Sequence, residues 1–276
     1  MPELLCPVCG APLRREDRAW RCENRHCFDV ARSGYVNLLP PSPAGRRHGD
    51  DRRMVDARTA FLSRGYYAHL EQAVAALSDE LTGPCARIVD AGCGEGTYDR
   101  RVLDRLRGSG KDVCLIGIDI STDAVHRAAR LVPEGVFCAA STAAMPLPSG
   151  SAGLLLNIFS PFMPEEFRRV LAADGYLLRV VPLERHLWEL KELIYDTPYE
   201  NPPFDPAADG FDLVRTERVE KTLLLTEPSD LQNLFQMTPY YYKTGAADQQ
   251  KLSGVQSLRV TTQFGVAVYR KSGFRG

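Results

Sequence analysis

Two patterns of apolar and polar positions alternate along the chain between residues 84 and 182. Short stretches that are apolar at almost every position are followed by stretches in which apolar residues recur at three- and four-residue spacing. The first pattern is typical of strands buried on both faces of a sheet, and the second of amphipathic surface helices. We expect strands within 86–91, 111–121, 135–141, 151–160 and 175–182, with helices in intervening segments. The alternation predicts an α/β fold with a mostly parallel sheet that helices cover on both faces.

The regions on either side of this block carry further elements. Helical patterns cover 52–64, 66–81, 186–195 and 227–237, and strand patterns cover 211–225 and 257–271. The stretch 40–51 is rich in proline, glycine and charge, which is typical of an exposed linker. We therefore expect an amino-terminal module at residues 1–39, a linker and helix at 40–65, and a main domain at 66–276.

The composition is that of a globular protein. Of 276 residues, 44% are hydrophobic and 25% are charged, and no apolar run approaches the ~20 residues of a membrane span. The first residues lack the features of a secretion signal, so we expect a cytoplasmic protein with no membrane partner. Eight cysteines in that compartment favour metal binding or free thiols over disulfides.

Charge is distributed unevenly along the chain. Residues 1–60 hold 11 arginines and no lysine against 8 acidic residues, a local net charge of +3 in a chain whose total is −1. A basic amino-terminal part favours a module that binds a polyanion, although solvated surface arginines explain the same counts equally well.

A glycine-rich turn, "VDAGCGEGTY", lies between an expected strand and an expected helix. Gly92, Gly94 and Gly96 have no side chains, so the backbone can approach a ligand closely. Their spacing differs from the G-x-G-x-x-G turn that holds the pyrophosphate of a dinucleotide, which makes a nicotinamide enzyme the weaker alternative. Asp90 would repel a pyrophosphate but can accept hydrogen bonds from an ammonium group, so the turn favours S-adenosylmethionine as the ligand.

Two further residues fit an adenosine. Asp119 ends the second expected strand, where a carboxylate can accept hydrogen bonds from both ribose hydroxyls. Ser141 follows the third expected strand and is placed to meet the edge of the adenine. The alternatives are a solvated strand end for Asp119 and an ordinary loop position for Ser141.

The segment from Cys6 to Cys27 contains five possible metal ligands. Cys6 and Cys9 form a Cys-x2-Cys knuckle, and Cys22 and His26 follow at a spacing that suits a closed tetrahedral zinc site. Cys27 is an alternative to His26 as the fourth ligand. Because a segment this short has little core to bury, a structural metal is expected to contribute to its folding.

The zinc module and the glycine turn together give the chain a resemblance to a known family over nearly its whole length. It resembles the bacterial methyltransferases that modify N1 of a guanine in 23S ribosomal RNA. The segments that carry the resemblance are "CPVCGAPL", "CENRHCFDVARSGYVNLLP", "RRMVDARTAFLSRGYY", "DAGCGEGTY", "RHLWELKELIY" and "LFQMTPYYY".

The resemblance implies a class I (Rossmann-like) methyltransferase domain with a small zinc ribbon that recognises RNA. It places the zinc ligands on Cys6, Cys9, Cys22 and His26, which leaves Cys27 as a neighbour. It places the S-adenosylmethionine contacts on the glycine turn, which includes Glu95 and Thr97, and on the more distant Tyr67 and His186.

The resemblance also implies partners and a cellular role. The family acts as a homodimer whose cleft holds a hairpin of 23S rRNA, in domain II near the peptide exit tunnel. One subgroup accompanies resistance to certain macrolides, and "NIFSPFMPEEF" looks nearer the Gram-positive type. Two other functions remain open: a methyltransferase acting on a small molecule, and an inactive zinc-ribbon protein that only binds nucleic acid.

The acceptor base is expected at the carboxyl ends of the strands, in the segment "NIFSPFMPEE". Asn157 is a candidate to bond the base edge, and Phe159 or Phe162 to stack on the base. Glu165 and Glu166 are candidate bases for the guanine N1 proton, although acidic residues in the first turn of a helix are more often stabilised there by the dipole. The sequence therefore leaves the catalytic base unassigned.

Overall fold

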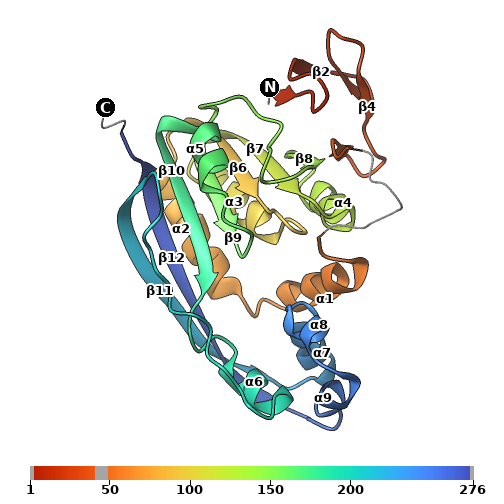
Figure 1. Ribbon diagram of the computed structural model, residues 1–276, viewed down its shortest axis with the longest axis vertical. Helices are drawn as coiled ribbons and strands as arrows, with labels where there is room; N and C mark the ends of the chain where they lie inside the picture. The colour runs from red at the N-terminus through yellow and green to blue at the C-terminus, as the bar shows by residue number, and fades with distance from the viewer. Residues whose placement is uncertain (1–2, 41–48, 274–276) are drawn as a thin grey trace.

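The computed structural model describes residues 3–40 and 49–273, which form a small sheet and a large sheet. The small sheet is antiparallel, in the order β1-β2-β3-β4, and it forms the zinc-ribbon module. Its strands are β1 (Leu4–Leu5), β2 (Pro12–Glu16), β3 (Ala19–Arg21) and β4 (Cys27–Asp29). Figure 1 shows this module at one end of the molecule.

The large sheet has eight strands in the order β11-β12-β10-β9-β6-β7-β8-β5. The strands are β5 (Val36–Asn37), β6 (Cys85–Ala91), β7 (Asp112–Asp119), β8 (Val136–Ala139), β9 (Ala152–Ile158), β10 (Leu171–Pro182), β11 (Phe211–Leu225) and β12 (Leu258–Lys271). From β5 to β10 all neighbours pair in parallel, and β12 is antiparallel to both β10 and β11. The mostly parallel α/β sheet expected from the sequence is confirmed.

Apolar side chains alternate between the two faces of this sheet and build two cores. In β6, Ile88 belongs to one core and its neighbour Val89 to the other, and Leu154 and Leu155 of β9 divide in the same way. This period of two in fully apolar strands is what a sheet covered on both faces requires. The helices of the described chain are α1 (Arg52–Ser63), α2 (Ala68–Leu81), α3 (Thr97–Gly108), α4 (Thr122–Leu131), α5 (Pro164–Val170), α6 (Trp188–Ile194), α7 (Pro228–Gln236), α8 (Tyr240–Lys243) and α9 (Ala246–Gln250).

The two faces are covered differently. Helices α1 to α4 contribute to the core of the first face, together with α6 and α7. The second core receives Phe167 of α5, and it also receives Leu13 and Trp20 of the zinc ribbon. The ribbon therefore shares a hydrophobic core with the main domain.

Backbone contacts also join the amino-terminal module to the main domain. The Leu5 amide donates to the Pro146 carbonyl at 2.8 Å, and the Leu38 amide donates to the Ala139 carbonyl at 2.9 Å. Strand β5 pairs in parallel with β8, so the end of the amino-terminal module forms the last strand of the large sheet. The domain limits at residues 39 and 66 stay a prediction, and in the structure elements on both sides of residue 39 share one sheet.

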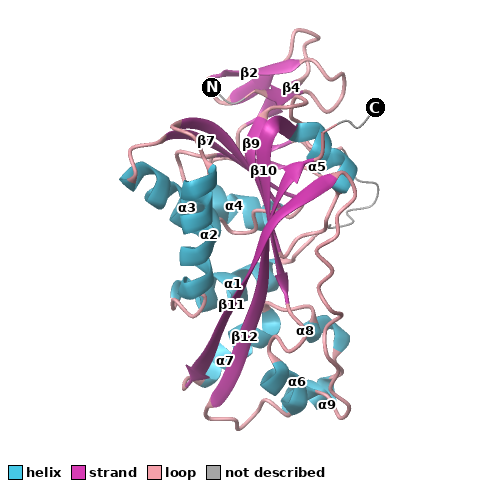
Figure 2. Cartoon of the chain, turned by 90° about the vertical axis from the view of Figure 1, so that its left-hand side faces the viewer, coloured by secondary structure: helices cyan, strands magenta, loops and turns pink. Residues whose placement is uncertain are grey.

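The last two strands form a long antiparallel ladder that extends away from the ribbon, as Figure 2 shows. Helices α7 to α9 follow β11 in the chain and lie at the far end of this ladder (Figure 1). Among the described residues, none of the helices has the length and apolar character needed to cross a membrane.

Replacing Gly117 of β7 by alanine tests how tightly the sheet is packed. A Cβ atom at this position would lie 2.5 Å from Cδ1 of the Phe137 ring and 3.0 Å from the Cys93 sulfur. We expect Gly117→Ala to lower the free energy of unfolding by about 1–3 kcal/mol, because the core must shift to accept the methyl group. Denaturant unfolding measures the change.

Gly153→Ala is the matched control in β9. Its Cβ atom would lie 3.6 Å from the Ala86 side chain, an ordinary van der Waals distance, so the stability should change little. Equal losses in the two variants would contradict this account of the packing around Gly117.

Candidate functional site

A cavity of about 770 Å³ opens at the carboxyl ends of the parallel strands. The glycine turn between β6 and α3 forms one wall. Gly92, Gly94 and Gly96 have φ angles of 98°, 55° and 88°, a left-handed conformation that other residues adopt at a cost. The backbone of this turn therefore favours glycine at all three positions, which is a reason additional to the close approach of a ligand expected from the sequence.

Gly92 also lacks a side chain for a packing reason. A Cβ atom there would lie 2.6 Å from the hydroxyl of Ser160, in the loop that follows β9. The Ser160 hydroxyl donates a hydrogen bond to the Ala91 carbonyl. The turn after β6 and the loop after β9 thus touch, and both line the cavity.

Asp119 lies across the turn at the end of β7. Its Oδ2 accepts a hydrogen bond from the Gly94 amide at 3.0 Å, and its Oδ1 accepts one from the Ser121 amide at 2.8 Å. Burial raises the pKa of Asp119, while these two amide donors act in the opposite direction. A carboxylate oxygen can accept more than one hydrogen bond, so both atoms keep capacity for a ligand hydroxyl.

Asp90 forms a buried acid pair with Asp99, which lies in the first turn of α3. Burial, reinforced by Asp99, raises the pKa of Asp90 well above its usual value. Burial also raises the pKa of Asp99, to about 7. Oδ1 of Asp90 has no hydrogen-bond partner among the described residues, and Asp90 lines the cavity. An unpartnered buried carboxyl oxygen at this place suits a cationic group of a ligand.

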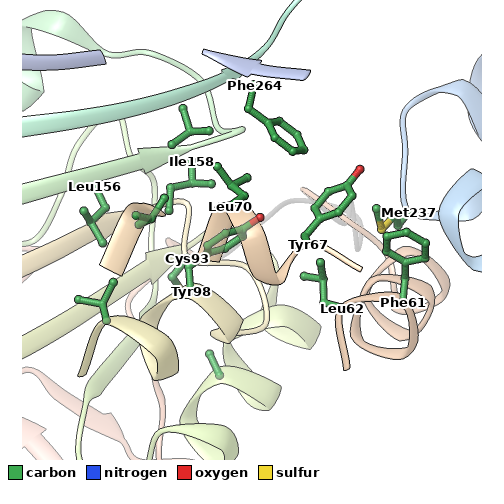
Figure 3. Close-up of a cluster of buried hydrophobic side chains, with 14 of the residues drawn as sticks. Phe61, Leu62, Tyr67, Leu70, Cys93, Tyr98, Leu156, Ile158, Met237 and Phe264 are labelled. Atoms are coloured by element: carbon green, nitrogen blue, oxygen red, sulfur yellow. The ribbon is translucent and has the colours of Figure 1, made fainter. Parts of the chain in front are cut away.

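Tyr67 and His186 are far apart in the sequence but meet at the opposite wall. Both rings contact Phe264 of β12, with centroid distances of 5.1 Å and 4.7 Å. Figure 3 shows the Tyr67 ring between Phe264 and Phe61 of α1. The Gln263 amide donates to Nδ1 of His186 at 3.1 Å, and burial lowers the pKa of this imidazole to about 3. The neutral ring therefore carries its proton on Nε2.

Most of the expected cofactor residues line this one cavity. They are Tyr67, Asp90, Gly92, Gly94, Glu95, Asp119, Ser141 and His186. Gly96 and Thr97 lie in the same turn outside the lining. Gly96 instead allows α4 to approach, because a Cβ atom there would lie 3.0 Å from the Cα atom of Ala128. The cofactor contacts themselves stay a prediction.

The sequence reasoning missed an ion pair in the cavity wall. Nη1 of Arg58 in α1 lies 2.5 Å from Oδ2 of Asp50, and Nη2 of Arg58 donates to the Met237 carbonyl at 3.3 Å. A signal was present in the sequence, since Arg58 lies four residues from both Met54 and Leu62. That spacing places a charged residue on the apolar face of an amphipathic helix.

The contacts of the loop after β9 distinguish among the residues that the sequence suggested for binding or deprotonating the acceptor base. The Asn157 side-chain amide donates to the Ser160 carbonyl at 3.2 Å, so Asn157 holds the loop and lies outside the cavity lining. Glu166 pairs with Arg169 at 2.7 Å and also accepts from the Met145 amide. Phe162 packs under the Arg179 guanidinium, at 4.4 Å from the ring centroid. Of these aromatic and acidic candidates, Phe159 lines the cavity.

The zinc ribbon brings together four of its five possible ligands. One ligand atom from each of Cys6, Cys9, Cys22 and His26 lies within 4.8 Å of the other three. The Cys9 and Cys22 sulfurs are 3.7 Å apart, and Nδ1 of His26 is 3.6 Å and 3.4 Å from the sulfurs of Cys6 and Cys22. A tetrahedron with Zn–S bonds of ~2.3 Å has edges of roughly this length, so the residues fit zinc.

Cys27 lies outside this group. It begins β4, pairs with Arg21 across the sheet and is exposed. The geometry therefore favours His26 as the fourth ligand, which is the choice that the resemblance implies.

Known proteins share both parts of the chain. The zinc-ribbon family described as "RlmA, N-terminal" matches residues 4–42. The 23S rRNA (guanine(748)-N(1))-methyltransferase of Streptomyces fradiae is 40% identical over 231 residues, which are 80% of this chain and 80% of that protein. The chain belongs to the 23S rRNA (guanine-N1)-methyltransferase family.

Two other relatives support the assignment of this methyltransferase to the family. A Micromonospora griseorubida protein with a provisional assignment to the same activity is 38% identical over 69% of each chain. A Bacillus subtilis protein with a similar provisional assignment is 29% identical over 96% of each chain.

Single substitutions test which residue is the fourth zinc ligand of this methyltransferase. We expect Cys27→Ser to retain one zinc per chain, because its thiol lies outside the ligand group. His26→Ala should lose zinc or bind it at least tenfold more weakly, because it leaves an incomplete tetrahedron. Metal analysis of the purified proteins measures both. Zinc lost from Cys27→Ser and kept by His26→Ala would reverse the assignment.

The buried acid pair predicts a pH-dependent stability. Asp99 has a pKa of about 7 in the folded protein and an ordinary value of 3.8 when unfolded, so between these values only the folded chain holds the proton. Its contribution is complete below pH ~4 and is lost as the pH rises to about 7. Asp99→Asn should therefore gain stability relative to the wild type as the pH is raised from 5 to 8.

Thermal unfolding of the ligand-free proteins at the two pH values measures this effect. We expect the melting temperature of Asp99→Asn, minus that of the wild type, to rise by roughly several degrees between pH 5 and pH 8. The same difference at both pH values would show that Asp99 does not hold a proton in the folded protein.

Proposed function

We propose that this methyltransferase moves the methyl group of S-adenosylmethionine to N1 of a guanine in 23S rRNA. The observation that carries the proposal is the cavity at the glycine turn in a domain whose core is shared with an arginine-rich zinc ribbon. The cavity suits the methyl donor, and the ribbon suits an RNA substrate. A relative that is 40% identical over 80% of this chain is named a 23S rRNA (guanine(748)-N(1))-methyltransferase.

The charges around the cavity fit the proposed donor. Four carboxylic residues line it, namely Asp50, Asp90, Glu95 and Asp119, and Arg58 is the only lysine or arginine of the lining in the described part of the chain. S-adenosylmethionine carries two positive groups, the ammonium and the sulfonium, and one carboxylate. An acidic cavity with one guanidinium complements that pattern, and it would bind the neutral demethylated product less strongly.

Individual residues take roles that follow from their contacts. Asp90, with an unpartnered buried oxygen, is placed for the ammonium group, and Arg58 for the carboxylate. Asp119 accepts the ribose hydroxyls, and Ser141 lies beyond β8 at the adenine end. Nε2 of His186 offers a hydrogen-bond donor that stays neutral at physiological pH, because the pKa of this ring is about 3.

The donor supplies an activated methyl group, so the protein has to align the acceptor and exclude water. Guanine N1 carries a proton at neutral pH, which must leave before or during transfer. The target guanine must also leave its stack in the RNA to reach the floor of the cavity. Tyr67 and Phe159 line the cavity with aromatic rings, and the buried Phe264 ring packs against both of them.

The ribbon is the proposed RNA-recognition module. Its exposed arginines are Arg14, Arg15, Arg18, Arg21, Arg25 and Arg32. Exposed arginines contact phosphates without reading sequence, so they raise affinity and orient the RNA. We also propose the finer features that the resemblance implies: a hairpin of domain II as the target, a homodimer whose cleft holds it, action in the cytoplasm, and a link to macrolide resistance.

Charge reversal tests whether the ribbon binds the RNA substrate. Deleting residues 1–39 would expose the core that the ribbon shares with the main domain, so point variants are the better test. We expect Arg14→Glu with Arg15→Glu to reduce methylation of 23S rRNA by roughly tenfold or more at low salt and to leave S-adenosylmethionine binding unchanged. Asp119→Ala should instead weaken donor binding.

Mass spectrometry of nuclease-digested rRNA, taken from a strain that lacks this activity and incubated with the protein, measures N1-methylguanine. Calorimetry measures donor affinity. An absence of N1-methylguanine after incubation with the wild type would overturn the proposed function. Full methylation of 23S rRNA by the charge-reversed protein would contradict the proposed role of Arg14 and Arg15 in binding RNA.

A further inference from the structure

Phe159 combines a strained backbone with an uncovered ring. Its φ angle is 54°, in the left-handed region that bulky residues avoid. In the described part of the main domain the only other residue of this kind, glycine apart, is Leu187, with φ of 57°. Both line the cavity. Backbone strain of this kind persists where the surroundings impose it, and it concentrates at functional sites.

Four hydrogen bonds impose the conformation of Phe159. Its amide donates to the Val180 carbonyl at 3.1 Å, and the Asn157 side chain donates to the carbonyls of Ser160 and Pro161 at 3.2 Å and 3.3 Å. The Ser160 hydroxyl donates to the Ala91 carbonyl. The loop is thus tied to the neighbouring strand and to the glycine turn, and the Phe159 side chain is directed into the cavity.

The two strained residues, Phe159 and Leu187, differ in the exposure of their side chains. The Leu187 side chain is 0% exposed, so its strain serves packing, whereas the Phe159 side chain is 45% exposed. Its nearest aromatic neighbours, Tyr98 and Phe264, have ring centroids 6.4 Å and 5.4 Å away and are inclined at 68° and 50°. Neither neighbour stacks parallel on Phe159, so the ring is available to a planar ligand.

We propose that Phe159 is the platform on which the target guanine stacks once it has left the RNA. This inference rests on the proposed function and names the residue that positions its acceptor. Aromatic side chains hold unstacked RNA bases by such contacts. Since Ser160 touches Gly92, the platform adjoins the turn at which we place the methyl donor, and a base stacked there shares the cavity with it.

Substitutions at Phe159 separate stacking from folding. Phe159→Ala removes the ring and keeps the strained backbone, and Phe159→Gly removes the ring and relieves the strain. We expect both to lower kcat/KM for rRNA methylation by roughly 10- to 100-fold, the range of an aromatic–base stack. Phe159→Gly should melt at a higher temperature than Phe159→Ala, which would exclude lost folding as the cause of its low activity.

Two further measurements distinguish stacking from a merely structural role of Phe159: the activity of variants that keep an aromatic ring, and the affinity for the methyl donor. Phe159→Tyr and Phe159→Trp keep a stacking ring and should stay within about threefold of the wild type. Donor affinity measured by calorimetry should stay within about twofold in all four variants, because the platform serves the acceptor. Tyr199→Ala is the matched control: this ring is 47% exposed and lies outside the cavity lining, so methylation should not change.

The outcomes distinguish this inference from the proposed function. Normal methylation by Phe159→Ala, or a tryptophan variant as slow as the alanine variant, would overturn the platform alone. A parallel loss of donor affinity would also overturn it and assign the ring to the donor side. If the wild type forms no N1-methylguanine in 23S rRNA, both proposals fail.

Discussion

The site depends on the close approach of two backbone segments, the turn after β6 and the loop after β9. Gly92 and Ser160 lie so near each other that a methyl group on Gly92 would overlap the serine hydroxyl. The parallel pairing of β6 with β9, in which Asp90 faces Leu156, brings the two segments to the same edge of the sheet. One segment carries the proposed donor contacts and the other carries Phe159. In the proposed function this contact therefore determines the distance between the methyl donor and the acceptor base.

The same region is unfavourable for folding. Asp90, Glu95 and Asp99 are buried at the glycine turn, and the raised pKa values of Asp90 and Asp99 show that burial opposes their charged forms. Glycines in left-handed conformations and a strained Phe159 add no stability either. The stabilisation therefore has to come from the two apolar cores on the faces of the sheet. A cationic ligand would offset part of the free energy that burial of these carboxyl groups costs, because its positive charge would stabilise their ionised forms.

Local patterns in the sequence predicted the parts of this arrangement that depend on neighbouring residues. Continuous apolar runs predicted the parallel strands, and the spacing of Gly92, Gly94 and Gly96 predicted a turn between a strand and a helix. The contacts of Phe264 beside the cavity could not be predicted from such local patterns. It lies in an apolar strand like many others, and its contacts with Tyr67 and His186 arise from the antiparallel pairing of β12 with β10. Arg58 differs from Phe264, because its place on the apolar face of a helix can be read from the sequence. Only the identity of its partner, Asp50, had to come from the structure.

The ribbon and the main domain form a continuous structure, which changes how the zinc site relates to the methyl-transfer cavity. The expected zinc ligands Cys6 and Cys22 belong to the same hydrophobic cluster as the sheet residues Val89 and Ile116. From this cluster the chain continues into β5, which pairs with β8 directly before Ser141. A metal that contributes folding energy to a small module also stabilises whatever shares its core. Zinc bound at this site would therefore support the edge of the sheet at the proposed adenine end of the cavity, and the proposed RNA recognition and donor binding would depend on one folded unit.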